Sequence, residues 1–308
     1  MKKMLVLLAI SLIVVTGCQS DSLDVSDVDI PERSEGFFWE AEHHDKTIYF
    51  LGTVHVGVEE MYPLRDEIEM AMDEADLLLT EIDASDEQRS EEMVSIQEQY
   101  ITLNEGERLE DYLDEKYIEE VEWIAENPGI EYEMLNVLQP WIVEELYNEM
   151  LIIESDYDFE YGVESYLYEN VLENADSMAL EDYEERLQAV RARDMNYQIY
   201  MLEETLEHTK EVFDEEIEKS VTAFRAGEEA LINHERKISE ESENPNIEET
   251  YLNEMLFNRD ERMAERVDEV VQNHDADTLF VAAGALHFFG EGNIIELLEE
   301  KGYEIERR

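Results

Sequence analysis

The chain has 308 residues, of which 82 are acidic and 22 basic, so its formal net charge is −60 at pH 7. A charge of this sign repels the phosphates of nucleic acids, and we therefore expect no nucleic-acid partner. Hydrophobic residues make up 44% of the chain, which is enough for a core and excludes wholesale disorder. The acidic residues are spread along the sequence and favour a halophilic type of surface, so a pair of carboxylates marks no site by itself.

The first residues are typical of an export signal. Lys2 and Lys3 precede the apolar run Met4–Val15, and Val15-Thr16-Gly17-Cys18 resembles a bacterial lipobox. In that pattern the cysteine is lipidated and becomes the mature N-terminus, so we expect lipidation at Cys18. An uncleaved N-terminal anchor is the alternative interpretation.

The domain organisation follows from this signal. We expect residues 1–18 to be a lipoprotein signal peptide and the acidic residues 19–35 to be a flexible tether. Residues 36–308 then form the folded domain. Either interpretation of the signal exports the protein and ties it to a membrane, on the outer face of the cell membrane or on the periplasmic side.

The first structural unit of the domain ends an apolar strand in a histidine turn. The run Tyr49–Leu51 leads into Gly52-Thr53-Val54-His55, which is a Gly-x-x-His sequence. Pro63 suits the first turn of a helix, and apolar residues then recur at helical spacing up to Ala75. Residues 76–82 predict a short buried strand that carries Glu81 one residue from its end.

The middle of the chain, from about residue 85 to 271, predicts a large helical insertion because glycine is scarce and β-type alternation is nearly absent. The expected helices cover residues 117–125, 142–153, 162–174, 187–212, 217–238 and 251–270.

The last part of the chain repeats the first structural unit. The apolar run Thr278–Ala283 leads into Gly284-Ala285-Leu286-His287. Residues 294–298 predict a helix that Gly302 caps, and residues 303–308 alternate as in an edge strand. Two β-Gly-x-x-His-α-β halves therefore predict an α/β (α+β) fold with one central sheet, in which both histidines lie at the carboxyl ends of parallel strands. Ligand sites in open α/β sheets collect at such ends.

The repeated context separates His55 and His287 from the other five histidines, which we interpret as solvated surface residues. Either histidine alone would be structural, but the pairing favours a functional role. Glu81 joins them because a carboxylate in an apolar strand is costly unless it is paired or metal-bound. Two imidazoles and a carboxylate are a common ligand set for a divalent catalytic metal.

The chain resembles the TraB/GumN family, which is related to the Tiki-type extracellular metalloproteases, over nearly all of its mature length. The resemblance rests most specifically on Gly284–His287 with the glycines that follow it, and it extends to several other segments. These are residues 38–40, 49–57, 62–64, 78–83, 103–109, 139–141, 161–164, 180–185 and 258–260. Three positions depart from the family pattern: Glu164, where Asp is commoner, Glu185, where Gln is commoner, and Asp260, where Asn is usual.

The resemblance implies a Tiki-like fold and an active site built from His55, His287 and Glu81. It implies that these three bind a divalent metal (Mn, Co or Zn), that Glu81 is catalytic, and that Arg259 stabilises developing negative charge. Glu164 and Glu181 are the implied substrate-binding residues.

Two functions fit the sequence. The first is an exported, membrane-tethered, metal-dependent hydrolase that acts on a peptide or protein. The second is a non-catalytic lipoprotein that binds a metal or a small ligand at the same site. Ligand side chains that converge in an open cleft favour the enzyme, whereas an occluded site favours the binding protein.

Overall fold

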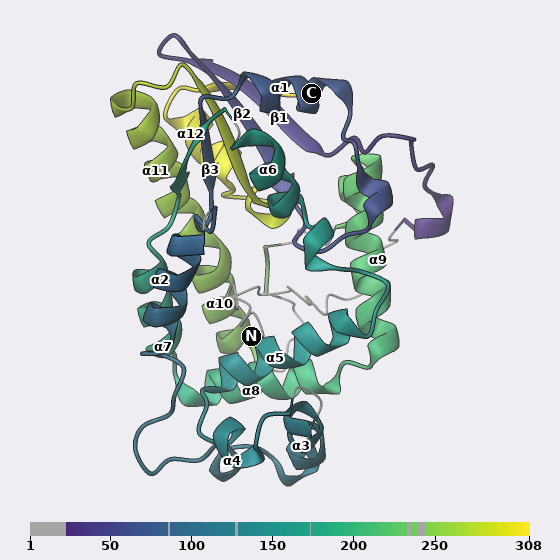
Figure 1. The fold of residues 1–308 in the computed structure, drawn as a ribbon, viewed down its shortest axis with the longest axis vertical. Coiled ribbons are helices and arrows are strands. Elements are labelled where there is room, and N and C mark those ends of the chain that lie inside the picture. Colours follow the sequence, from purple (N-terminus) through teal and green to yellow (C-terminus); the bar gives the residue numbers. More distant parts are fainter. Residues whose placement is uncertain (1–22, 86, 127–128, 173, 233–235, 239–243) are drawn as a thin grey trace. The chain divides into compact units, whose positions relative to one another are not determined.

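The computed structural model describes residues 23–85, 87–126, 129–172, 174–232, 236–238 and 244–308 (Figure 1). Cys18, the expected signal peptide and the start of the expected tether lie outside these ranges. The described residues form two compact units. The helical unit contains residues from 87–156 and 182–216, and the sheet unit contains those from 23–85, 157–181 and 217–308.

The sheet unit is built on six strands in the order β4-β3-β5-β2-β1-β6. β2 pairs in parallel with β5, and β3 in parallel with both β5 and β4, whereas β1 is antiparallel to β2 and β6. The strands are β1 (Phe37–His43), β2 (Lys46–Thr53), β3 (Leu77–Thr80), β4 (Asp176–Ala179), β5 (Thr278–Gly284) and β6 (Glu304–Arg307). The expected α/β class with one central sheet is therefore confirmed.

Each predicted half is present as a strand, a helix and a second strand of the same direction. The first half is β2, α1 (Asp66–Glu74) and β3, and the second is β5, α12 (Ile294–Glu300) and β6. β5 lies between β2 and β3, so the two halves interlock within one sheet. The expected first-turn role of Pro63 is wrong, because α1 begins only at Asp66.

The centre of the sheet is apolar on both faces, as parallel strands require when helices cover them. Every residue from Leu77 to Thr80 in β3 and from Leu279 to Ala283 in β5 is at most 1% exposed. α1 contacts α6 (Val163–Val171), and α12 contacts α11 (Asn258–Asn273). We expected Glu81 to lie within this strand, but β3 ends at Thr80 and Glu81 is the first residue after it.

One long helical run leads from the middle of the chain to the second half. α10 (Pro245–Leu252) continues through a π-helical turn, Asn253–Phe257, into α11. Such turns are rare inside helices and often occur at functional sites. Here the turn directly precedes the Asn258-Arg259-Asp260 segment.

The helical unit contains six described helices, among which α5 packs on α8 and α3, and α2 on α7. They are α2 (Glu87–Gln97), α3 (Ile118–Glu126), α4 (Tyr132–Leu135), α5 (Pro140–Ile153), α7 (Tyr183–Arg191) and α8 (Met195–Glu207). The single helix expected over 187–212 is divided, because Asp194 caps α8 through the backbone of Asn196, and α9 (Lys210–Ala226) begins anew. β4 is a further difference, since it lies inside the stretch expected to be helical.

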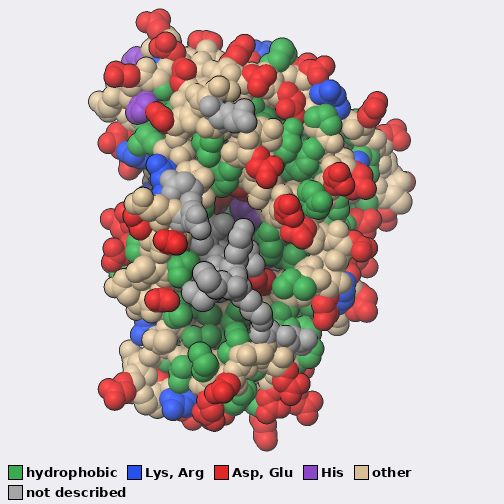
Figure 2. All heavy atoms as spheres, viewed as in Figure 1, with side chains coloured by type: hydrophobic (Ala, Val, Ile, Leu, Met, Phe, Trp, Pro, Cys, Tyr) green, Lys and Arg blue, Asp and Glu red, His purple; other side chains and the backbone are tan. Residues whose placement is uncertain are grey.

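The end of the expected tether is already bound to the sheet unit. The Ser34 hydroxyl donates to the Met61 carbonyl at 2.6 Å, and the Glu35 amide donates to the Arg225 carbonyl at 2.9 Å. Within the described ranges, no helix has the length and apolarity needed to cross a bilayer. Acidic side chains are scattered over the face seen in Figure 2.

Candidate functional site

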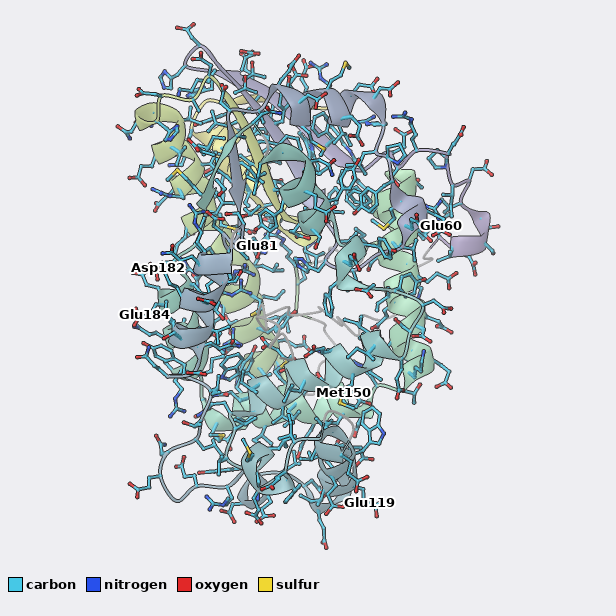
Figure 3. All side chains as sticks on the ribbon, viewed as in Figure 1. Glu60, Glu81, Glu119, Met150, Asp182 and Glu184 are labelled. Carbon is cyan, nitrogen blue, oxygen red and sulfur yellow. The ribbon has the colours of Figure 1, made fainter. Side chains whose placement is uncertain are left out.

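The sheet register brings the two Gly-x-x-His turns together. Thr53, the second residue of the first turn, pairs with Gly284, the first residue of the second turn, across the parallel strands β2 and β5. β3 lies on the other side of β5, with Thr80 opposite Ala282. Glu81, which is labelled in Figure 3, therefore follows the end of β3 at the edge of the sheet where the two Gly-x-x-His turns begin.

Gly284 is the point on which the three predicted residues converge. A Cβ atom placed on Gly284 would lie 3.3 Å from Glu81 Oε1, 3.5 Å from His55 Nε2 and 3.8 Å from His287 Cδ2. The Gly284 amide also donates to Glu81 Oε1 at 2.7 Å. The expected convergence of both histidines and the glutamate is confirmed, and it takes place within the sheet unit.

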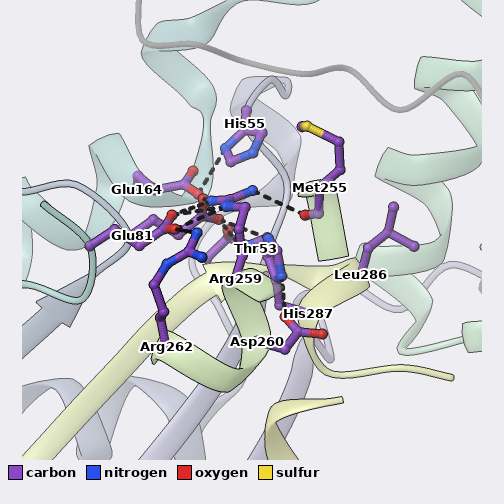
Figure 4. Close-up of polar contacts among 12 residues, drawn as sticks. Thr53, His55, Glu81, Glu164, Met255, Arg259, Asp260, Arg262, Leu286 and His287 are labelled. Carbon is purple, nitrogen blue, oxygen red and sulfur yellow. Dashed lines mark hydrogen bonds and ion pairs between the residues drawn. The ribbon is translucent and has the colours of Figure 1, made fainter. Parts of the chain in front are cut away.

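His55 is held on its Nδ1 side by a carboxylate. Its Nδ1 lies 2.9 Å from Glu164 Oε1, and the Thr53 hydroxyl donates to the same oxygen (Figure 4). Burial by itself raises the pKa of Glu164, but the charge of His55 and the hydrogen bonds from His55 and Thr53 outweigh it, and the net pKa is lowered. Glu164 is therefore an ionised partner of the imidazole at neutral pH.

The backbone fixes this pair by a close approach of two loops. Gly57 and Asp158 exchange two amide-to-carbonyl hydrogen bonds of 3.0 Å, and the Val163 amide donates to the Val54 carbonyl at 3.0 Å. A Cβ on Gly162 would lie 2.3 Å from the His55 carbonyl oxygen, which only glycine avoids. Gly162 directly precedes α6, and Glu164 lies in the first turn of that helix. The close approach of the two loops therefore brings Glu164 next to His55.

His287 is held in the same way by a different carboxylate. Its Nδ1 lies 2.5 Å from Asp260 Oδ1, and Asp260 Oδ2 lies 2.5 Å from Arg236 Nη1. Arg236 Nη2 also donates to the carbonyl of Leu286, the residue before His287. The Asp260 side chain is completely buried and that of His287 is 4% exposed, so this chain of contacts is shielded from water.

Glu81 connects the histidines to two further charged residues. Its Oε1 lies 3.9 Å from His287 Nε2, and its Oε2 forms an ion pair with Arg259. Arg259 also binds Glu181, with Nη2 at 2.6 Å and Nε at 2.9 Å from Oε2. Burial opposes the charge of Arg259, but Glu81 and Glu181 outweigh it and raise the pKa of Arg259 further above its usual range. The expectation that Arg259 faces the site is confirmed.

The donor set fits a divalent metal in its chemistry. Both imidazoles have a carboxylate at Nδ1, which is the usual outer partner of a metal-binding histidine. Nε2 of His287 lies near Glu81, and Nε2 of His55 lies near Gly284. Two donors of one tetrahedral ion, each at about 2.1 Å, are about 3.4 Å apart. The 3.9 Å between His287 Nε2 and Glu81 Oε1 is close to that spacing. Among the described residues, no group of three or more His, Cys, Asp or Glu side chains is placed so that it could hold a metal ion.

The residues expected to bind substrate take part in this network. Glu164 contacts His55, and Glu181 contacts Arg259 and, at 3.5 Å, the half-exposed Arg262. Sequence reasoning noticed Asp260 only as a departure from the family pattern and missed it as the partner of His287. It also missed Arg236, for which neither spacing nor an apolar context gave a signal.

Comparison with known proteins identifies the family of the chain. The model of the TraB/PrgY/gumN family matches residues 37–307, and the chain belongs to that family. A metalloprotease TIKI homolog of Nematostella vectensis is 38% identical over 77 residues, which are 25% of this chain and 15% of that protein. Metalloprotease TIKI1 of Danio rerio is 27% identical over 146 residues, which are 42% of this chain and 30% of that protein.

The match extends further in a bacterial relative. An uncharacterized protein of Treponema pallidum (strain Nichols) is 20% identical over 276 residues, which are 87% of this chain and 82% of that protein. The chain thus spans less than a third of the two TIKI proteins that it matches. No solved structure matches the chain significantly. The similarity supports a metallopeptidase-like family.

Proposed function

We propose that this member of the TraB/PrgY/gumN family is a metal-dependent hydrolase that cleaves peptide bonds. The observation that carries the proposal is the arrangement around Gly284. Glu81 Oε1 and His55 Nε2 would both lie within 3.5 Å of a Cβ atom there, and the ring of His287 follows at 3.8 Å. Each imidazole has its own carboxylate at Nδ1, which leaves Nε2 as the nitrogen suited to a metal.

His55, His287 and Glu81 are the residues that would hold the metal. When bound there, a divalent ion supplies a water of lowered pKa and polarises a carbonyl group. The rest of the network keeps these donors in place. Glu164 and Asp260 hold the two rings, the Gly284 amide holds Glu81 Oε1, and Arg259 compensates the charges of Glu81 and Glu181.

The charge of the network supports a cation. The contacts described above join four carboxylates, those of Glu81, Glu164, Glu181 and Asp260. Three guanidinium groups contact them, those of Arg236, Arg259 and Arg262. With both imidazoles neutral, as metal ligands are, the four carboxylates outnumber the three guanidinium groups by one, and this negative excess favours a cation over an apolar ligand. Similarity to the TIKI metalloproteases supports the peptidase class.

The test is metal analysis followed by a cleavage assay on the full-length chain purified in high salt. We expect bound Mn²⁺, Co²⁺ or Zn²⁺ near one ion per chain, and cleavage of a peptide library that a chelator abolishes and added metal restores. His55→Asn and His287→Asn should lose the metal and the cleavage. His44→Asn is the matched control, because His44 is exposed in a turn and asparagine tolerates its positive φ of 53°.

Two results would count against the proposal in different ways. A chain that binds none of these ions would remove the metal site. A chain that binds an ion and cleaves no peptide in the library would favour the non-catalytic lipoprotein that the sequence also allows.

We also propose that the protein is exported and anchored through lipid on Cys18, which rests on the sequence of residues 1–18. The measurement is incorporation of a labelled fatty acid by cells that express the chain. Incorporation should disappear in Cys18→Ser, and equal labelling of that variant would contradict the anchor.

A further inference from the structure

We infer that Arg236 is a positioning residue of the proposed metal site, which acts through Asp260 on the imidazole of His287. The inference rests on the proposed function as far as the metal is concerned. The orientation of His287 itself is a property of the chain and can be measured without metal.

Arg236 contacts both the side chain and the backbone that set the position of His287. Its Nη1 lies 2.5 Å from Asp260 Oδ2, and its Nη2 donates to the Leu286 carbonyl. Asp260 Oδ1 in turn lies 2.5 Å from His287 Nδ1. One planar guanidinium therefore fixes the carboxylate that holds the ring and the peptide group that carries the ring. The flexible ammonium of lysine does not reproduce this forked geometry.

Burial makes this pairing obligatory. The side chains of Arg236, Asp260 and His287 are 2%, 0% and 4% exposed. A carboxylate buried without a cation is strongly destabilising, so loss of Arg236 should disturb the position of Asp260 against His287. The Asp260 carboxylate faces Nδ1, so the ring of His287 is turned with its other nitrogen, Nε2, away from Asp260. Nε2 is the nitrogen that lies 3.9 Å from Glu81 Oε1.

The contacts also separate Arg236 from the other arginines of the site. Arg259 binds Glu81 and Glu181, and Arg262 binds Glu181, so both of these arginines contact glutamates of the site. Arg236 is the guanidinium that contacts Asp260 among the described residues. Arg236 and Asp260 should therefore behave as one unit, in which removal of either member has the effect of removing both.

The experiment uses the full-length chain and two readouts. The first is the ¹⁵N–¹H spectrum of labelled histidine in the metal-free protein, in which a strongly hydrogen-bonded Nδ1–H gives a far-downfield proton signal. We expect this signal for His287 in the wild type and expect it to shift or vanish in Arg236→Gln, although Asp260 is retained. Arg266→Gln is the matched control, because Arg266 lies on the same helix as Asp260 and pairs with Glu269 at 2.7 Å.

The second readout is the affinity for Co²⁺ from its visible absorption. Arg236→Gln and Asp260→Asn should each weaken binding by about 10- to 100-fold, as loss of an outer-shell partner typically does. The double variant replaces a buried ion pair by a neutral pair and should be no weaker than Asp260→Asn alone. Arg266→Gln should bind Co²⁺ like the wild type.

Three outcomes overturn the inference. An unchanged His287 signal in folded Arg236→Gln would show that Arg236 does not orient the ring. Wild-type Co²⁺ affinity in Arg236→Gln would show that Arg236 does not contribute to metal binding. Additive losses in the double variant would show that Arg236 does not act through Asp260. If the wild type binds no Co²⁺, the proposed function fails, while the histidine spectrum still decides the orientation.

Discussion

His55 Nδ1 lies 2.9 Å from the carboxylate of Glu164, and this contact has a counterpart in the other half of the protein. There, His287 Nδ1 lies 2.5 Å from Asp260. Each carboxylate comes from a helix, α6 or α11, that lies outside the Gly-x-x-His turn itself. In both halves, the Nδ1 atom of the histidine ring thus contacts a carboxylate, although the two carboxylates come from unrelated segments.

The first prediction concerns this shared arrangement. Glu164→Gln keeps the size of the side chain but removes the charge that holds His55. We expect Co²⁺ binding to weaken by about tenfold or more, because outer-shell partners orient metal-binding histidines. Titration of the visible Co²⁺ spectrum measures the effect. Glu160→Gln is the control, since Glu160 is exposed four residues earlier. Equal affinities in all three proteins would contradict a role for Glu164.

The sheet could be predicted because its central strands are short, apolar and bounded by glycine. Thr278–Ala283 and Tyr49–Leu51 are such runs, and both are strands in the structure. β4 was missed because Asp176–Ala179 carries an exposed or half-buried residue at every position, so it lacks the apolar signal of a central strand. The division of residues 187–212 was missed because capping by Asp194 interrupts a pattern whose helical periodicity continues.

The centre of the site could be predicted because both histidines occur in repeated sequence contexts. The outer partners could not, because no periodicity relates Glu164 to His55 or Asp260 to His287. Their contacts depend on loop-to-loop approaches, such as that of Gly162 to the His55 carbonyl. Arg236 was invisible for a simple reason: an arginine in a charged segment is usually a surface residue, and only the fold shows that its side chain is 2% exposed.

The second prediction concerns the helical unit. Burial raises the pKa of Glu144 on α5 to about 7, against the opposing effects of Arg193 and Thr205. Between its ordinary value of 4.5 and 7, the folded state binds more protons than the unfolded state, so stability falls as the pH rises through this window. The Glu144→Gln variant has no carboxyl group at this position, so its stability should not fall in this way as the pH rises.

Urea unfolding in high salt measures the effect. The stability gained by Glu144→Gln over the wild type should be about 1–2 kcal/mol larger at pH 8 than at pH 5.5, at ~1.4 kcal/mol per pKa unit. Glu133→Gln, which replaces an exposed glutamate on α4, should show no such dependence. A gain that is the same at both pH values would mean that Glu144 is ionised throughout.

The third prediction concerns salt. The formal charge of −60 is spread over the chain, and the mutual repulsion of these charges opposes the compact state. At about 1 M salt the screening length falls to roughly 3 Å, and most of this repulsion disappears. The melting temperature of the full-length chain should therefore rise steeply between low and molar sodium chloride. Equal melting temperatures would rule out the halophilic interpretation of the surface.

The last prediction places one methyl group at the centre of the site. Gly284 has φ −50° and ψ 138°, an ordinary conformation for any residue, so Gly284→Ala strains no backbone. The new Cβ would nevertheless lie 3.3 Å from Glu81 Oε1 and 3.5 Å from His55 Nε2, between two of the proposed metal ligands. Glycine-to-alanine changes at compatible positions stabilise proteins by about 0.4–1 kcal/mol through the unfolded state.

We therefore expect Gly284→Ala to melt no lower than the wild type while its Co²⁺ affinity falls at least tenfold. Thermal melting and Co²⁺ titration of the same preparation separate the two effects. His44→Asn, a substitution at an exposed turn, should change neither quantity. Unchanged Co²⁺ affinity in Gly284→Ala would mean that the ion binds away from Gly284, and the assignment of His55, His287 and Glu81 as its ligands would then be wrong. A large fall in melting temperature would instead show that the site is packed too tightly for a methyl group, and that it holds no space for an ion.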